Sequence, residues 1–102
     1  MQHANTDIND ATKQKIINII SALLPNASIY LFGSRARGSY QKGSDVDIAL
    51  EENGPIDFVV IGELNSLFEA SNIIHRIQVV DINAVSEKMR ENILKDKIIW
   101  KH

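Results

Sequence analysis

Two short motifs at a fixed separation constrain the fold of this chain more than any other feature. Gly33-Ser34 ends the apolar run Ile29–Phe32, and Asp45-x-Asp47 opens the apolar run that ends at Leu50, with ten residues between the motifs. Both runs contain β-branched residues and are bounded by glycine, proline or asparagine, a pattern that predicts strands. Residues 33–44 are rich in glycine, serine and charge, and they predict a turn and loop between the two strands.

Helices and a third strand are predicted around these two strands. Apolar residues recur at helical spacing in three segments, and each segment begins near a residue type that caps helices, namely Asn9 or Asp10, Asp57 and Ser86. The first helix is expected to end before Pro25 and the last at about Lys97, with a strand over Ile77–Ile82. The expected inward positions are Ile16, Ile19, Ile20, Leu23 and Leu24, then Phe58, Ile61, Leu64, Leu67 and Phe68, and last Met89, Ile93 and Leu94.

The expected order is therefore α-β-β-α-β-α, an α/β (α+β) fold with a short mixed sheet of three or more strands and helices packed on it. The C-terminal segment Ile98-Ile99-Trp100 has two interpretations. It packs on the sheet, or it forms a surface for a partner, because aromatic residues are enriched in interface cores.

Length and composition limit the class of protein. With 102 residues the chain is expected to form a single domain, 1–102, with a loose tail at 1–8. A net charge of −2 argues against direct nucleic-acid binding. The absence of cysteine excludes disulfides and thiolate metal sites. No apolar run approaches the roughly 20 residues that span a bilayer, and the polar N-terminus is not a signal peptide, so a cytoplasmic location without membrane contact is expected.

The two motifs also predict chemistry. A glycine turn allows close approach of a ligand, and successive backbone N–H groups there form a concavity for anions such as phosphate. Arg35 and Arg37 follow the turn and offer forked donors for phosphate. Asp45 and Asp47 are two residues apart on a strand, so their carboxylates lie on one face and suit a divalent cation such as Mg²⁺. The alternative is a tight turn with solvated arginines and two exposed acids.

The spacing of Gly33-Ser34 and Asp45-x-Asp47 resembles the signature of the nucleotidyltransferase superfamily related to DNA polymerase beta. The fuller string Phe-Gly-Ser-Arg-Ala-Arg-Gly, followed by Ser-Asp-x-Asp, is similar to its minimal nucleotidyltransferase branch. This resemblance implies a bare nucleotidyltransferase palm that transfers AMP from ATP to a tyrosine hydroxyl of a small helical HEPN-type ribonuclease toxin, and so acts as the antitoxin. It implies two Mg²⁺ ions on Asp45 and Asp47, and a nucleotide held by Gly33, Ser34, Arg35, Arg37 and Ser44.

The chain departs from the family pattern at one position. Members carry a third acid on the following strand, and the matching position here is Gln78, whose neutral amide cannot act as a carboxylate base. Asp81 lies three residues later, so strand alternation places it on the opposite face. Two interpretations follow. The first is an active AMP transferase with weakened metal binding, or one that borrows a group from its partner. The second is a pseudo-enzyme, a nucleotide-binding or purely protein-binding antitoxin that neutralises its partner by forming a complex. The base preference, the acceptor and self-association of the chain are left open.

Overall fold

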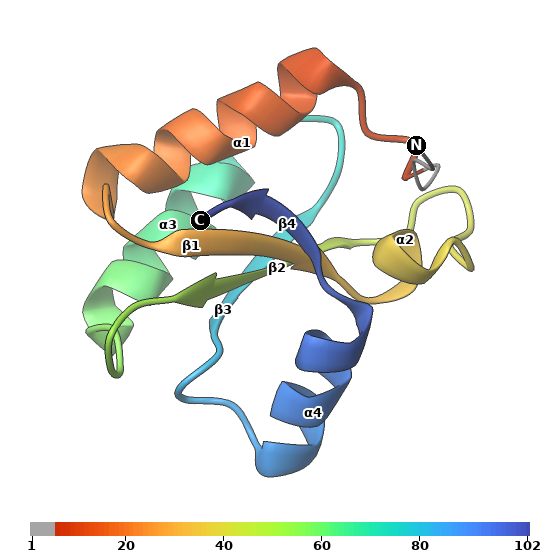
Figure 1. Ribbon diagram of the computed structural model, residues 1–102. Coiled ribbons are helices and arrows are strands. Elements are labelled where there is room, and N and C mark those ends of the chain that lie inside the picture. Colours follow the sequence, from red (N-terminus) through yellow and green to blue (C-terminus); the bar gives the residue numbers. More distant parts are fainter. Residues whose placement is uncertain (1–5) are drawn as a thin grey trace.

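The structure, a computed structural model, describes residues 6–102, and within that range helices and strands alternate along the chain (Figure 1). The elements are α1 Asp10–Leu23, β1 Ser28–Phe32, α2 Ser34–Arg37, β2 Val46–Glu51, α3 Phe58–Ala70, β3 Ile77–Asp81, α4 Glu87–Asp96 and β4 Ile98–Lys101. The fold is mixed α+β, as predicted, but its order is α-β-α-β-α-β-α-β.

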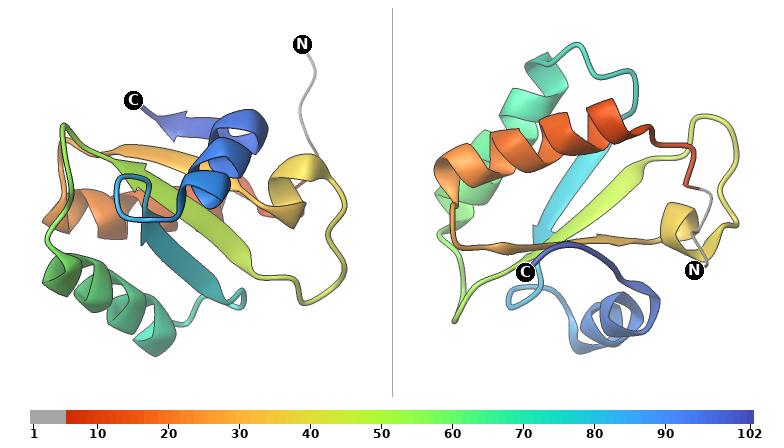
Figure 2. Two further views of the ribbon diagram at one scale, coloured as in Figure 1. Left: turned by 90° about the horizontal axis from the view of Figure 1, so that it is seen from below. Right: turned by 45° about the horizontal axis from the view of Figure 1, so that its top comes forward.

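The four strands form one mixed sheet in the order β3-β2-β1-β4. β1 pairs antiparallel with both β2 and β4, whereas β2 pairs parallel with β3. A parallel pair needs a crossover connection, and α3 provides it. Figure 2 shows α1 and α3 on one face of the sheet and α4 on the other.

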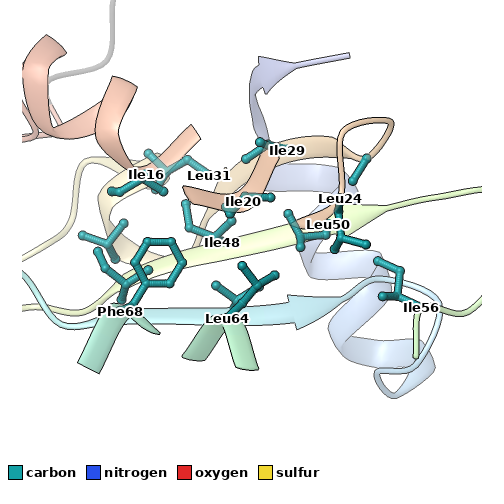
Figure 3. Close-up of a cluster of buried hydrophobic side chains, with 14 residues drawn as sticks. Ile16, Ile20, Leu24, Ile29, Leu31, Ile48, Leu50, Ile56, Leu64 and Phe68 are labelled. Carbon is teal, nitrogen blue, oxygen red and sulfur yellow. The ribbon is translucent and has the colours of Figure 1, made fainter. Parts of the chain in front are cut away.

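The larger core lies between the sheet and the pair α1 and α3 (Figure 3). Ile48 and Leu50 of β2 are fully buried there, and strand alternation places both on the same face of the sheet. Side chains from β1 and both helices complete it, including Ile29, Leu31, Ile16, Ile20, Leu64 and Phe68. A smaller cluster on the opposite face packs α4 against the sheet and contains Tyr30, Ala49, Ile82 and Ile93.

The predicted helix starts are confirmed by their hydrogen bonds. The Asn9 side chain accepts from the Thr12 N–H at 2.8 Å, and the Ser86 hydroxyl accepts from the Met89 N–H at 3.2 Å. The Asp57 carboxylate accepts from the Val59 N–H at 2.9 Å. Each side chain satisfies a donor that the helix itself cannot pair.

The predicted order lacked two elements that the structure contains, α2 and β4. Residues 33–44 contain the one-turn helix α2 and are not only turn and loop. Residues 98–101 form β4, which pairs with β1 at the edge of the sheet. Sequence analysis missed this strand because it is short and follows α4 after a single residue. Trp100 is half-buried against the larger core, so the structure favours the packing interpretation of this segment.

The predicted inward faces of α3 and α4 were too wide. On α3, Phe58 is 84% exposed and Leu67 is 46% exposed. On α4, Ile93 is buried, whereas Met89 and Leu94 are 41% and 45% exposed. Helical periodicity identifies one side of a helix, but the width of the contact depends on the surface that covers it. α4 meets only a small part of the sheet.

Part of the predicted tail at 1–8 is held in place. Residues 1–5 lie outside the described residues. The Thr6 carbonyl accepts a hydrogen bond from Arg35 at 2.8 Å, and Ile8 packs against the larger core. Within residues 6–102 no helix combines the length and apolar character needed to cross a membrane.

The buried face of α4 can be tested by two alanine substitutions on this helix. Ile93→Ala should lower the free energy of unfolding by about 2–5 kcal/mol, because it leaves a cavity under α4. Leu94→Ala is the control, and it should change stability by no more than about 0.5 kcal/mol because its side chain is already half exposed. Urea unfolding of both variants provides the measurement. Equal losses would contradict the observed face.

Candidate active site

The two motifs of the sequence meet where β1 ends and β2 begins. Phe32 pairs with Asp47 across the antiparallel strands, so Gly33 lies directly beside the Asp47 carboxylate. A Cβ added to Gly33 would lie 3.2 Å from both Cβ and Cγ of Asp47, and still closer to one carboxylate oxygen. Gly33 also has a φ of 79° and a ψ of −158°, a conformation found almost only in glycine. Glycine is therefore required at position 33 for two reasons: there is no room for a Cβ, and other residues rarely adopt this backbone conformation.

The second carboxylate changes the electrostatics of the first. Partial burial raises the pKa of Asp47, the negative charge of Asp45 raises it further, and the nearby Arg37 guanidinium lowers it. Because Asp45 and Asp47 are half-buried and repel each other, the ionised pair is costly without a cation. The site therefore offers two carboxylates whose mutual repulsion a bound cation would relieve, which fits a hard divalent ion such as Mg²⁺.

Arg35 has a role that the sequence interpretation did not include. Its side chain is only 1% exposed, and its Nε and Nη2 donate to the Ser44 carbonyl at 3.1 and 3.0 Å. Nη1 donates to the Thr6 carbonyl at 2.8 Å, and Nη2 lies 3.4 Å from Nδ1 of His75. The guanidinium thus joins three chain segments from inside the protein, and it is turned away from solvent.

Arg35 and Ser44 together fix the loop that leads into β2. The Ser44 hydroxyl accepts from the Gln41 N–H at 2.8 Å, and the Ser44 N–H donates to the Gln41 carbonyl at 2.9 Å. The guanidinium of Arg35 lies 4.9 Å from the centre of the Tyr40 ring. Since Asp45 directly follows Ser44, these contacts hold the backbone from which the first carboxylate projects.

Arg37 lies on the solvent side of the same short helix. Its side chain is 50% exposed, and its Nη1 donates to the Asp96 carboxylate at 2.8 Å. This ion pair ties α2 to the end of α4. A guanidinium carries five N–H donors, so one bond to Asp96 does not exhaust its capacity to bind phosphate.

The strand register places Gln78 beside Asp47. β2 and β3 are parallel, with Asp47 paired to Gln78, and both side chains are half-buried on the face opposite the larger core. Asp81 lies on the other face, as predicted, and is 4% exposed. Its carboxylate accepts from the Ile56 N–H at 2.7 Å and from the Asn83 N–H at 2.9 Å, so it holds a loop. Within residues 6–102 no group of three or more histidine, aspartate or glutamate side chains could hold a metal ion.

His75 serves the fold, in line with the ordinary expectation for a lone histidine. Burial lowers the pKa of its imidazole, and the neighbouring Arg35 guanidinium lowers it further. A neutral ring can accept from Arg35 at Nδ1. No local signal could have revealed this contact, because His75 and Arg35 are 40 residues apart.

Comparisons with known proteins agree with this arrangement. Residues 14–102 match the family described as "Polymerase beta, Nucleotidyltransferase".

The chain belongs to the polymerase beta nucleotidyltransferase family.

Among curated relatives of this nucleotidyltransferase, the "Probable protein adenylyltransferase MntA" of Haemophilus influenzae is 31% identical over 96 residues, which cover 94% of this chain and 84% of the relative. A solved toxin-antitoxin structure with AMP-PNP matches with a TM-score of 0.74 and 27% identity, over 88% of this chain and 73% of the other. A structure of a tri-AMPylated Shewanella oneidensis HEPN toxin in complex with MNT antitoxin matches with a TM-score of 0.68 and 25% identity, over 88% of this chain and 70% of the other.

The contact between Gly33 and Asp47 can be tested by adding a methyl group to the nucleotidyltransferase. Gly33→Ala should weaken binding of AMP-PNP with Mg²⁺ at least about tenfold, a loss of about 1.4 kcal/mol, because the new Cβ displaces the Asp47 carboxylate. Gly38→Ala is the control, since Gly38 has a φ of 80° but no atom within 4 Å of the added Cβ. Titration calorimetry on both folded variants gives the comparison. Equal effects would mean that backbone strain, and not the carboxylate contact, is what matters.

The partial burial of Asp47, together with its repulsion by Asp45, raises its pKa and predicts a pH-dependent stability. A carboxyl with a raised folded-state pKa binds more protons folded than unfolded, so its stability contribution falls as pH rises above the ordinary value of 3.8. In metal-free protein, Asp47→Asn should therefore increase the free energy of unfolding at neutral pH, and the gain should vanish toward about pH 4.

Denaturant unfolding in a chelator across this pH range measures the effect. Glu63→Gln, at an exposed carboxylate on α3, is the matched control and should show no such trend. A loss of stability in Asp47→Asn at neutral pH would contradict the predicted cost of the ionised pair.

Proposed function

We propose that this nucleotidyltransferase transfers AMP from ATP to a hydroxyl of a small helical HEPN-type protein and so acts as that protein's antitoxin. The proposal is carried by one observation: the glycine turn and the Asp45 and Asp47 pair are packed into a single site through the contact of Gly33 with Asp47. It is supported by relatives described as protein adenylyltransferases and by similar structures described as toxin-antitoxin complexes.

The nucleotide phosphates are assigned to the side of the site formed by α2. The backbone at Gly33 is open to close approach because it has no Cβ. Ser34 begins α2 and offers a hydroxyl and an N–H, and the half-exposed Arg37 offers a forked donor. Arg35 and Ser44 act differently in this proposal, since their polar groups hold the loop that carries Asp45.

Asp45 and Asp47 would hold Mg²⁺. The donor chemistry fits, because the two carboxylates lie close enough to repel each other without a cation. When bound there, the ion would supply charge neutralisation on the triphosphate and would lower the pKa of the acceptor hydroxyl. Two ions are expected from the family resemblance. The neutral Gln78 beside Asp47 lowers the negative charge available for them.

In the transfer step the acceptor oxygen forms a bond to the α-phosphorus of ATP. The bond from that phosphorus to the oxygen bridging to the β-phosphorus breaks, and pyrophosphate leaves with the electron pair. The hydroxyl proton is released to solvent water, and the Gln78 amide, which is not a base, takes no part in accepting it. The contribution of the protein is to position the reactants and to stabilise charge.

A second candidate function is favoured by Gln78. Without a third carboxylate next to Asp47, the chain would bind nucleotide or its partner without turnover, and would neutralise the partner by forming a complex. The two candidates share the fold and the nucleotide site. They differ in whether AMP becomes covalently attached to the partner.

Labelled ATP, Mg²⁺ and a HEPN-type protein encoded beside this chain provide the test. Intact-mass analysis should show the gain of AMP on the partner, and Asp45→Asn should abolish it because the cation is lost. Asp57→Asn is the matched control, since Asp57 lies outside the site at the start of α3. An unmodified partner that is nevertheless bound and silenced would refute the transferase and support the binding function.

A further inference from the structure

The last residue of α4 is an acid, at a place where the helix itself disfavours one. Asp96 ends α4, and the unpaired carbonyls at a helix C-terminus repel a negative charge. The rest of the helix follows the usual preference, with Glu87 in the first turn and Lys95 in the last. The Asp96 side chain is also only 13% exposed. Local chemistry therefore does not explain this carboxylate, and such conflicts are typical of functional positions.

The partner of Asp96 is a residue of the candidate site. Its carboxylate accepts a hydrogen bond from Nη1 of Arg37 at 2.8 Å, across 59 residues of sequence, and α2 lies beside the end of α4 (Figure 2). Val46 and Ile48 point into the larger core, so Asp47 between them projects from the opposite face of the sheet. α4 packs on that same face. The end of α4 therefore borders the site.

The ion pair is not what docks α4 on the sheet. Arg37 is 50% exposed, and exposed ion pairs add little to stability because water competes for the charges and long side chains lose freedom. Ile93 is buried against the sheet, and Nη1 of Arg90 donates to Oδ1 of Asn83 at 2.9 Å. These contacts hold α4 without Asp96.

The bond to Asp96 determines where the Arg37 charge lies. It uses Nη1, whereas Nε and Nη2 form the other planar edge of the guanidinium, which suits two phosphate oxygens. Arg37 also has a competing position, because its charge is close enough to Asp47 to lower the pKa of that carboxyl. An arginine drawn onto Asp47 would neutralise the charge that attracts a cation, and it would no longer be free to bind phosphate.

We propose that Asp96 is a positioning residue, which holds the Arg37 guanidinium ready for a nucleotide phosphate and keeps it off the Asp47 carboxylate. This inference rests on the proposed function, in which Arg37 binds phosphate. Asp96 acts through Arg37 and does not contact the nucleotide, since two negative groups repel each other. Its removal should therefore weaken nucleotide binding, although simple charge repulsion predicts that losing an acid near a triphosphate strengthens it.

Titration calorimetry with AMP-PNP and Mg²⁺ on the full chain tests the sign of this effect. Asp96→Asn should weaken binding about tenfold, while the midpoint of urea unfolding stays close to that of the unsubstituted chain. Asp96→Glu keeps the charge and should bind within about threefold of the unsubstituted chain. Glu91→Gln removes an exposed acid from the same helix and is the matched control, with an expected change of about twofold at most.

A double-mutant cycle decides whether Asp96 acts through Arg37. Arg37→Ala should weaken AMP-PNP binding at least as much as Asp96→Asn, and the two substitutions together should cause no further loss. Stronger or unchanged binding in Asp96→Asn would overturn the inference, because only charge repulsion would then be at work. Equal losses from Asp96→Asn with and without Arg37, or equal losses in Asp96→Asn and Asp96→Glu, would also overturn it.

The same titrations separate this inference from the proposed function. An unsubstituted chain that does not bind AMP-PNP with Mg²⁺ would remove the nucleotide site, and both proposals with it. Binding that is lost in Asp45→Asn but kept in Asp96→Asn would leave the proposed function standing and overturn only the positioning role of Asp96.

Discussion

The arrangement of the site depends on the close contact between the Asp47 carboxylate and the backbone of Gly33. Antiparallel pairing of Phe32 with Asp47 sets this contact, and the missing Cβ of glycine makes room for it. The turn cannot move away without breaking the β1 and β2 ladder, which forms the centre of the sheet. The position of the carboxylate relative to the turn is therefore fixed by the same hydrogen bonds that hold the fold together.

The buried guanidinium of Arg35 holds the rest of the site in place. An arginine that is 1% exposed would be costly without partners, and here the Ser44 and Thr6 carbonyls accept its donors while His75 lies against it. The same bonds join the N-terminal segment, the loop before Asp45 and the start of β3.

The charges of the site act against stability and in favour of binding. Asp45 and Asp47 repel each other in the free protein, and a bound cation would remove that repulsion. Gln78 reduces the repulsion that a third acid would add beside Asp47, and it also removes a possible ligand and base.

The sequence by itself determined the features that depend on local chemistry. Capping residues fixed the helix starts, glycine and the paired aspartates marked the ends of β1 and β2, and strand alternation placed Asp81 away from the site. Only the tertiary structure decided the features that depend on distant neighbours. β4 becomes a strand because the β1 edge is available to pair with it, Leu94 stays exposed because no surface covers it, and Arg35 turns inward toward carbonyls far apart in the chain. Local patterns record the preferences of a segment, whereas burial and pairing depend on the partner that the fold brings to it.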